Sequence, residues 1–302
     1  MAFLDSMDYA DYGVRAFVQD CDRFEKYLLA SKPRLESFHP FFEKAFWEML
    51  EKGGKRFRPN LLLAVVSAEA RAAVLNSFDV ALAIECLHTY SLIHDDLPSM
   101  DNASLRRGHP TLHTSYGETG AILVGDGLNT YSFYLLSRAR LAPATKVALI
   151  ECLSYNGGLG GMVLGQALDC AFEGVPLMEN GLEFIHRHKT GALIAASLKM
   201  GALIAGLDSK KQNLLYDFGQ ELGLFFQLRD DLIDATQDDL QAGKSTHKDE
   251  AKNSYVNLLG IDGARDRLSK QSSYLRESLN ELGLDGVRKN LEALLSSYLA
   301  PI

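Results

Sequence analysis

Apolar residues recur at intervals of three and four along most of the chain, and this spacing is typical of helices. Segments with strict alternation and many β-branched residues are missing, and most of the prolines fall between the periodic stretches. We therefore predict an all-α fold with almost no sheet. The clearest periodic sets are Phe41, Phe42, Ala45, Phe46 and Met49; Val80, Leu82, Ala83, Leu87 and Tyr90; and Leu214, Phe218, Leu222, Phe225 and Phe226.

Two of the predicted helices, residues 80–96 and 218–231, are apolar around most of their circumference. Such helices are buried on all sides, so we expect both at the centre of a large helical bundle. No linker divides the chain, and a single domain over residues 1–302 is predicted. Two polar stretches, residues 99–115 and 236–254, interrupt the pattern and are candidate active-site loops or lids.

Each of the two apolar helices ends in a cluster of aspartates. Pro98 disfavours helical geometry at Leu97, so the last aspartate of the first cluster should come from a loop. In the second cluster the outer aspartates are four residues apart and share one helical face. Carboxylates suit Mg²⁺, which usually takes one or two protein carboxylates together with substrate phosphate oxygens. The clusters, Asp95, Asp96 and Asp101 and then Asp230, Asp231 and Asp234, therefore predict a magnesium site for a phosphorylated substrate.

A polar stripe runs along the first of these helices. His88, Ser91 and Asp95 share roughly one face at 3.6 residues per turn. Taken alone, His88 could be a hydrogen-bonded core histidine, and Asp95 and Asp96 a solvated helix end. The second acidic cluster makes a functional site the better interpretation.

A site that binds a diphosphate also needs fixed cations, because metal-holding acids do not compensate the charge of the substrate. Basic residues occur near the acidic clusters and at two other places. Each is more often a solvated surface charge, but their coincidence with two acidic clusters favours a binding site. The candidates are Lys55 and Arg58; Arg106 and Arg107; Lys189, followed by Thr190; and Lys244 and Lys252.

Composition narrows the remaining classes. The net charge of −8 argues against a general nucleic-acid surface. The chain contains no run of about 18 uninterrupted apolar residues, so we do not expect it to span a membrane. Residues 1–20 lack the basic and apolar regions of a secretory signal. The four cysteines are scattered and are expected to be buried free thiols. We therefore expect a cytoplasmic protein.

Five segments resemble, in order and spacing, the trans-polyprenyl diphosphate synthases: residues 53–59, 88–108, 165–169, 188–191 and 226–234. The similarity is closest to the bacterial farnesyl diphosphate synthase branch, whose first aspartate-rich motif has the two-residue insertion seen here as Pro98 and Ser99. The resemblance implies an all-α bundle around a central cavity, usually a homodimer, with the acidic motifs facing each other.

The resemblance also implies roles for individual residues. Asp95 and Asp101 would be the principal Mg²⁺ ligands, and Asp230 would complete a cluster of three ions, with Mn²⁺ as an alternative metal. Asp96, Asp231 and Asp234 would support these ligands. The allylic diphosphate would contact Arg106, Lys189, Thr190, Gln227 and Lys244. Isopentenyl diphosphate would contact Lys55, Arg58, His88 and Arg107.

The implied reaction condenses isopentenyl diphosphate with an allylic diphosphate, dimethylallyl and then geranyl. Tyr90 lies five residues before Asp95, roughly 7.5 Å deeper along a helix. It would act as the floor of the tail pocket and favour the fifteen-carbon farnesyl product; as an ordinary core residue it would leave geranylgeranyl diphosphate as the alternative. A class I terpene cyclase would not need the second diphosphate pocket. A non-catalytic partner subunit would commonly lack some of the six aspartates.

Overall fold

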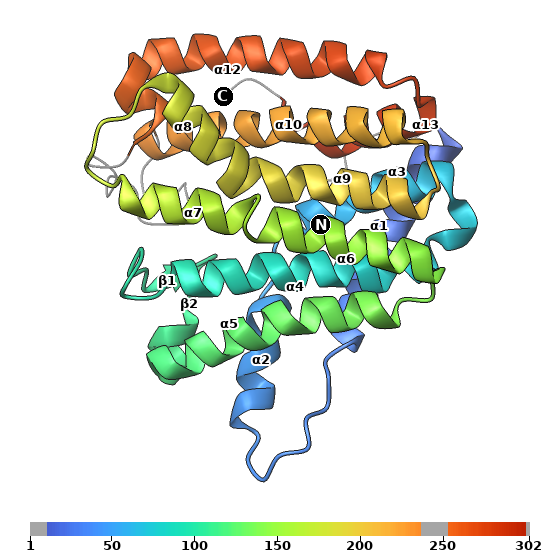
Figure 1. Cartoon of the computed structure of the whole chain (residues 1–302), viewed down its shortest axis with the longest axis vertical. Helices are drawn as coiled ribbons and strands as arrows, with labels where there is room; N and C mark the ends of the chain where they lie inside the picture. Colours follow the sequence, from blue (N-terminus) through green and yellow to red (C-terminus); the bar gives the residue numbers. More distant parts are fainter. Residues whose placement is uncertain (1–10, 237–252, 300–302) are drawn as a thin grey trace.

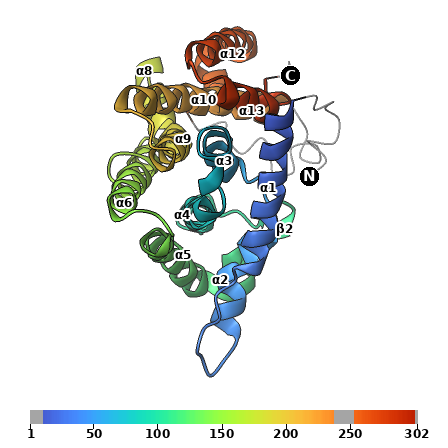
Figure 2. The same ribbon diagram turned by 90° about the vertical axis from the view of Figure 1, so that its right-hand side faces the viewer.

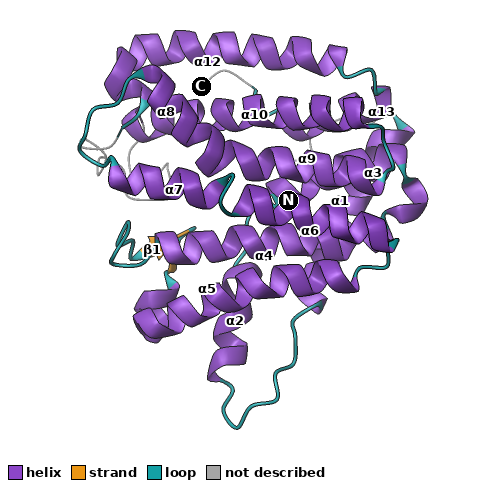
Figure 3. Cartoon of the chain, in the orientation of Figure 1, coloured by secondary structure: helices purple, strands orange, loops and turns teal. Residues whose placement is uncertain are grey.

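The computed structural model describes residues 11–236 and 253–299. Long helices lie side by side in a stack that runs from α12 to α5 (Figure 1), and almost all of the regular structure is helical (Figure 3). The elements are α1 (Tyr12–Ala30), α2 (Phe41–Glu51), α3 (Phe57–Glu69), η1 (Arg71–Ala73), η2 (Leu75–Ser77), α4 (Phe78–Asp95), β1 (Leu105–Arg106), β2 (His109–Pro110), α5 (Leu112–Arg138), α6 (Pro143–Gly157), α7 (Met162–Ala171), α8 (Glu179–His186), η3 (Arg187–Gly191), α9 (Ala192–Ile204), α10 (Ser209–Thr236), α12 (Tyr255–Glu281) and α13 (Asp285–Leu295).

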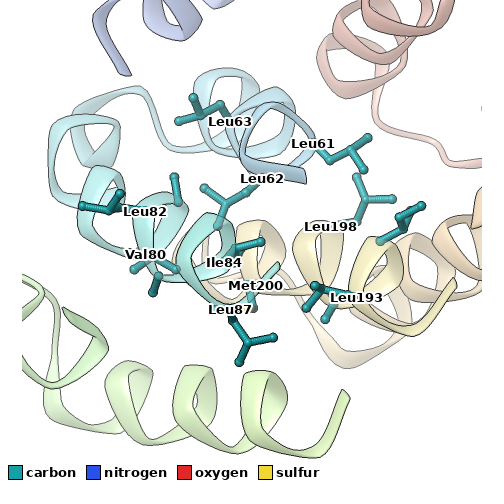
Figure 4. Packing of buried hydrophobic residues seen from close by; sticks show 14 of the residues in the cluster. Leu61, Leu62, Leu63, Val80, Leu82, Ile84, Leu87, Leu193, Leu198 and Met200 are labelled. Carbon is teal, nitrogen blue, oxygen red and sulfur yellow. The ribbon is translucent and has the colours of Figure 1, made fainter. Parts of the chain in front are cut away.

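Helix α4 is the centre of the bundle, as its apolar circumference predicts. In the view along the helices, α3 and α4 lie inside a ring formed by the other helices (Figure 2). Leucines of α3 pack against α4 and α9, and Ile84 of α4 lies near both Leu62 of α3 and Met200 of α9 (Figure 4). Leu62 and Ile84 are completely buried, and burying one such side chain contributes about 2 kcal/mol.

Helix α10 does not occupy a second central position. It packs between α9 and α12, and Figure 2 shows it towards the outside of the bundle. Phe218 and Leu222 face the core, whereas Asp217 on the same helix is exposed. Within the predicted stretch 218–231 only Asp230 is exposed, so the predicted burial around most of the helix is confirmed, whereas the central position is not.

The first polar stretch folds into a turn and a hairpin at the end of α4. In the described residues, β1 and β2 are the only strands, and they pair antiparallel with Leu105 opposite Pro110. This agrees with the expectation of almost no sheet. The last four residues of the stretch already belong to α5. The second polar stretch falls mainly on residues 237–252, outside the described residues.

Two composition-based expectations are tested by the fold. Residues 143–171 are long and apolar enough to cross a membrane by length and composition alone, but they form two helices, α6 and α7, separated by a turn. A core segment passes the same test, so this is weak evidence for a membrane span. Cys21, Cys86 and Cys152 are buried free thiols as predicted, whereas Cys170 is exposed, which corrects the prediction for that residue.

Candidate active site

The first acidic cluster surrounds the C-terminal end of α4. Pro98 ends the helix, and the following turn folds back over it. The N–H of Asp101 donates to the carbonyl of Asp95 at 2.9 Å, and the N–H of Ala103 donates to that of Asp96 at 3.2 Å. Asp101 thus comes from a turn, as predicted, and its backbone satisfies a terminal helix carbonyl.

The two adjacent aspartates of this cluster have different surroundings. Oδ1 of Asp95 accepts a hydrogen bond from Nε2 of Gln166 at 2.7 Å. Asp96 is buried, and its Oδ1 accepts from Nε of Arg106 at 2.7 Å. Burial raises the pKa of Asp96 to about 6, against the opposing charge of Arg106. Asp96 therefore positions Arg106, whose Nη2 also lies 3.8 Å from Oδ2 of Asp95.

The second cluster forms part of the last turns of α10. Both oxygens of Asp231 accept hydrogen bonds, one from Nε2 of Gln227 at 2.9 Å and one from the N–H of Tyr255 at 2.8 Å. Burial raises the pKa of Asp231 to about 7. Gln227 in turn accepts from the hydroxyl of Thr190 at 3.2 Å. Asp231 thus supports Gln227 and Thr190. Asp230 precedes it and Asp234 follows it on the same helix.

The carboxylates fit a metal that is completed by its substrate. Within residues 11–236 and 253–299, no group of three or more His, Cys, Asp or Glu side chains is close enough to hold a metal alone. Mg²⁺ is usually held by one or two carboxylates plus phosphate oxygens. Asp95 and Asp101, at the end of α4, are two carboxylates, the number that Mg²⁺ usually takes from a protein.

Lys189 and Thr190 lie in a π-helical turn, η3, of the kind often found at functional sites. Nζ of Lys189 donates to Oδ2 of Asp169 at 2.6 Å. Although burial alone would lower the pKa of Lys189, Asp95 and Asp169 raise it, so the ammonium stays charged. Gly165 of α7 packs against the turn so closely that a Cβ there would lie 2.1 Å from the backbone nitrogen of Lys189.

His186, just before this turn, is a buried histidine that should make the stability of the fold depend on pH. Its ring is 4% exposed and lies against Tyr255, with ring centroids 5.3 Å apart. Burial lowers the pKa of His186 from 6.5 to about 4. The unfolded state therefore binds the proton first, and stability should fall as the pH decreases from about 6.5 to 4, by up to about 3 kcal/mol.

Urea unfolding across this pH range measures the effect. His186→Phe keeps a ring but cannot be protonated, so its stability should depend less on pH than that of the wild type. His109→Phe, a substitution at an exposed position, should retain the wild-type dependence. Equal pH dependence in the wild type and His186→Phe would show that protonation of His186 is not the cause of the loss of stability at low pH.

Two cavities meet at the site. The first has a volume of about 560 Å³ and is lined by many basic side chains; we call it the basic cavity. The second, of about 360 Å³, has mainly apolar walls and is called the apolar cavity. Arg58, His88 and Thr190 line both, so a molecule in one is adjacent to a molecule in the other.

The basic cavity contains the four residues predicted to hold isopentenyl diphosphate, Lys55, Arg58, His88 and Arg107. Nη1 of Arg58 lies 3.1 Å from Nε2 of His88. Burial lowers the pKa of His88 well below its usual value, with Arg58 adding to the effect, so the ring is neutral and accepts. Burial also lowers the pKa of Arg58 to about 10, which still leaves it charged at neutral pH.

Arg107, which lines this cavity, lies against the loop formed by Gly53 and Gly54. Its Nη1 donates to the carbonyl of Gly53 at 2.5 Å. Gly54 has a φ of +143°, and a Cβ there would lie 2.6 Å from the same guanidinium nitrogen. The glycine pair thus permits both the backbone conformation and the close approach of Arg107.

The apolar cavity contains the predicted floor residue. Tyr90 is 8% exposed and lines the cavity, with its ring edge-on to His94 at 5.7 Å. Ser91 and Asp95 line the same cavity. Met162 of α7 also lines the cavity, four residues before Gln166, which contacts Asp95. The predicted stripe on α4 therefore faces one cavity with Asp95 at its polar end.

Sequence reasoning missed three residues here. Arg56, between the two predicted ligands Lys55 and Arg58, is buried and pairs with Glu25 at 2.9 Å and Glu85 at 3.1 Å. Arg229 and Tyr298 also line the basic cavity. Arg229 lies within the recognised segment 226–234 but was given no role, and Tyr298 lies outside all five segments. Lys244 and Lys252 lie outside the described residues.

Comparison with known proteins defines the class. The family model "Polyprenyl synthetase" matches residues 39–283, and the chain belongs to this family. It is a trans-prenyltransferase, as the resemblance implies. Within the family, the chain is 45% identical over 249 residues to the farnesyl diphosphate synthase of Geobacillus stearothermophilus, covering 81% of this chain and 84% of that one.

A solved structure agrees over nearly the whole chain. The geranyltransferase of Helicobacter pylori, crystallised with magnesium and isoprenyl diphosphate, has a TM-score of 0.93 and 49% identity, covering 97% of this chain and 99% of that chain. Geranylgeranyl pyrophosphate synthase 4 of Arabidopsis thaliana is less similar, at 35% identity over 291 residues, which are 94% of this chain and 76% of that protein. The family implies dependence on Mg²⁺ and substrates that are isopentenyl and allylic diphosphates.

Proposed function

We propose that the chain is a farnesyl diphosphate synthase, which condenses isopentenyl diphosphate with dimethylallyl and then geranyl diphosphate. The observation that carries the proposal is the pair of adjoining cavities. One is basic and suits a diphosphate, the other is apolar and suits a hydrocarbon tail, and the first acidic cluster lies at the polar end of the apolar one. The higher identity to bacterial farnesyl synthases does not favour the geranylgeranyl alternative.

Isopentenyl diphosphate would occupy the basic cavity, with its diphosphate near Lys55, Arg58 and Arg107 and its alkene directed towards Thr190. The allylic substrate would place its tail in the apolar cavity and its diphosphate near Asp95 and Lys189, with Arg106 and Lys244 as further contacts. This arrangement brings the two reacting carbons together where the cavities meet.

Bound Mg²⁺ supplies charge stabilisation for the departing diphosphate. The allylic carbon–oxygen bond breaks first, and Lys189 stabilises the negative charge that grows on the leaving oxygen. The hydroxyl of Thr190 and the amide of Gln227 present dipoles to the allylic cation. The isopentenyl double bond then attacks the cation, and a proton leaves the adjacent carbon, with the departed diphosphate as the base.

We assign three Mg²⁺ ions, with Asp95, Asp101 and Asp230 as ligands and Asp96, Asp231 and Asp234 as supporting residues. The hydrogen bonds made by Asp96 and Asp231 to protein groups support this division. Mn²⁺ is expected to replace Mg²⁺ because it prefers the same oxygen ligands.

Incubation with labelled isopentenyl diphosphate and dimethylallyl diphosphate, with and without Mg²⁺, tests the function. After dephosphorylation, metal-dependent farnesol is the expected product. Geranylgeraniol would retain the chemistry and contradict the assigned chain length. Absence of elongation with every metal would contradict the proposal and favour a non-catalytic subunit or a terpene cyclase.

Tyr90→Ala is expected to lengthen the product. Tyr90 lines the apolar cavity five residues before Asp95, which is roughly 7.5 Å along a helix and on the scale of one to two isoprene units. Its removal should move a large part of the product from fifteen to twenty or more carbons while condensation continues. Chromatography of the alcohols measures the distribution. An unchanged distribution would place the floor at another residue and make Tyr90 an ordinary core residue.

We propose a homodimer of single-domain subunits, each formed by residues 1–302, located in the cytoplasm. Apolar side chains exposed on α5 and α6 support an interface there: Leu123 is 52% exposed, Val147 65% and Tyr155 63%. Sedimentation equilibrium of the purified chain distinguishes a dimer from a monomer.

A further inference from the structure

The cations of the basic cavity differ in how they are held. Six line it: Lys52, Lys55, Arg56, Arg58, Arg107 and Arg229. Lys52 pairs with Glu48, and Arg56 pairs with two glutamates. Arg58 bonds to His88, and Arg107 to the carbonyl of Gly53. These contacts fix four of the six to other protein groups.

Lys55 and Arg229 are held in a different way. Nζ of Lys55 lies 5.1 Å from the ring centre of Tyr298, and Cζ of Arg229 lies 5.9 Å from the same centre. These are cation–π distances. Nε of Arg229, like Nε of Arg58, is buried and has no hydrogen-bond partner among the described residues. A buried guanidinium donor without a partner costs free energy unless a ligand satisfies it.

The aromatic ring between these cations is itself fixed. Tyr298 is 6% exposed, and its ring contacts Phe57 at 5.3 Å and Phe226 at 4.8 Å. Burial raises the pKa of Tyr298 to about 12, so the phenol is neutral. A neutral aromatic ring positions a cation without neutralising it, which leaves the charge available to a ligand in the cavity.

We propose that Arg229 is a further substrate-binding residue, which donates to the diphosphate of isopentenyl diphosphate from the α10 side of the basic cavity, with Tyr298 as the positioning residue for Arg229 and Lys55. Arg229 and Lys55 contact the same ring and line the same cavity, so a diphosphate bound there is adjacent to both residues. Arg229 directly precedes Asp230, and the two therefore connect the basic cavity with the second acidic cluster. This inference rests on the proposed function for its substrate.

Steady-state kinetics with each substrate varied separately tests the proposal. Arg229→Gln should raise the KM for isopentenyl diphosphate by about tenfold or more, the effect of one lost charge-assisted hydrogen bond. The kcat and the KM for the allylic substrate should change by less than about threefold, which is well below the expected rise in the KM for isopentenyl diphosphate. Arg229→Lys should recover part of the affinity. Tyr298→Leu should raise the same KM, and Tyr298→Phe, which keeps the ring, should raise it less.

Lys210→Gln provides the matched control, because Lys210 is an exposed cation at the other end of α10. It should leave both KM values unchanged. An unchanged KM for isopentenyl diphosphate in Arg229→Gln would overturn the proposal. A change confined to the allylic substrate or to Mg²⁺ would also overturn it, because Arg229 would then act on the Asp230 cluster.

A binding measurement separates this inference from the proposed function. Calorimetric titration of metal-free protein with inorganic pyrophosphate does not require turnover. Weaker binding by Arg229→Gln than by the wild type and Lys210→Gln supports Arg229 as a diphosphate ligand, even if the wild type forms no product. Equal binding by all three would overturn the assignment.

Discussion

Asp95→Asn is expected to lower kcat/KM by at least about 1,000-fold, or about 4 kcal/mol of transition-state stabilisation. Asparagine has the same shape and can still accept the hydrogen bond from Gln166. The change therefore removes the charge of one carboxylate while the end of α4 keeps its structure. Without that charge, Mg²⁺ and the allylic diphosphate lose a shared contact at the polar end of the apolar cavity.

Two measurements separate a lost metal ligand from a damaged fold. The melting temperature of Asp95→Asn should equal that of the wild type in the absence of ligands. Mg²⁺ with pyrophosphate should raise the wild-type melting temperature, since ligands that bind only the folded state stabilise it, and should raise that of the variant much less. Asp217→Asn, at an exposed position of α10, is the control and should behave as the wild type. More than a tenth of wild-type activity in Asp95→Asn would contradict the ligand assignment.

Much of the first acidic cluster could be predicted because its determinants are local. The apolar circumference of residues 80–96 predicts a central helix, and α4 is that helix. Pro98 predicts that Asp101 comes from a turn, and the turn is present. Such features depend on helical periodicity and on the geometry of proline, which act within a few residues.

The basic cavity could be predicted only in part because its residues are sorted by distant contacts. Lys55, Arg56 and Arg58 are close in sequence, and nothing local distinguishes them. Arg56 also lines the cavity, but its charge is paired with Glu25 and Glu85, which come from α1 and α4. Only the packing of those helices shows which of the three cations is structural.

The remaining differences have the same cause. Arg229 and the predicted ligand Lys55 both contact the ring of Tyr298, which is about 70 residues further along the chain than Arg229. The apolar pattern of α10 predicts burial, but it does not show that α12 rather than the central helix covers one side. Contacts between segments far apart in sequence decide both features, and periodicity does not report them.

Gly165→Ala is expected to cause the second large loss, because this glycine sets the distance between α7 and η3. A Cβ at residue 165 would lie 2.1 Å from the backbone nitrogen of Lys189 and 2.6 Å from its Cα. Backbone atoms cannot turn away as a side chain can, so α7 and the π-helical turn must separate. Overpacking of this kind costs about 3 kcal/mol of folding stability.

The separation should also impair the reaction. Lys189 and Gln166 lie on the two sides of this contact, and Gln166 positions Asp95. A displacement of about 1 Å can lower activity about 100-fold, and we expect a fall in kcat of that size at temperatures well below the melting transition. Kinetics and calorimetric melting of the same preparation measure the two effects.

Gly181→Ala is the matched control for this substitution. Gly181 is also helical, in α8, but a Cβ there would meet its nearest side-chain atom, Cδ2 of Leu177, at 3.6 Å, an ordinary contact. Alanine should therefore be neutral or stabilise the helix by up to about 1 kcal/mol. If Gly165→Ala were as active and as stable as Gly181→Ala, the close approach of α7 would not position Lys189. A stable but inactive Gly165→Ala would instead show that the contact acts on the reaction more than on the fold.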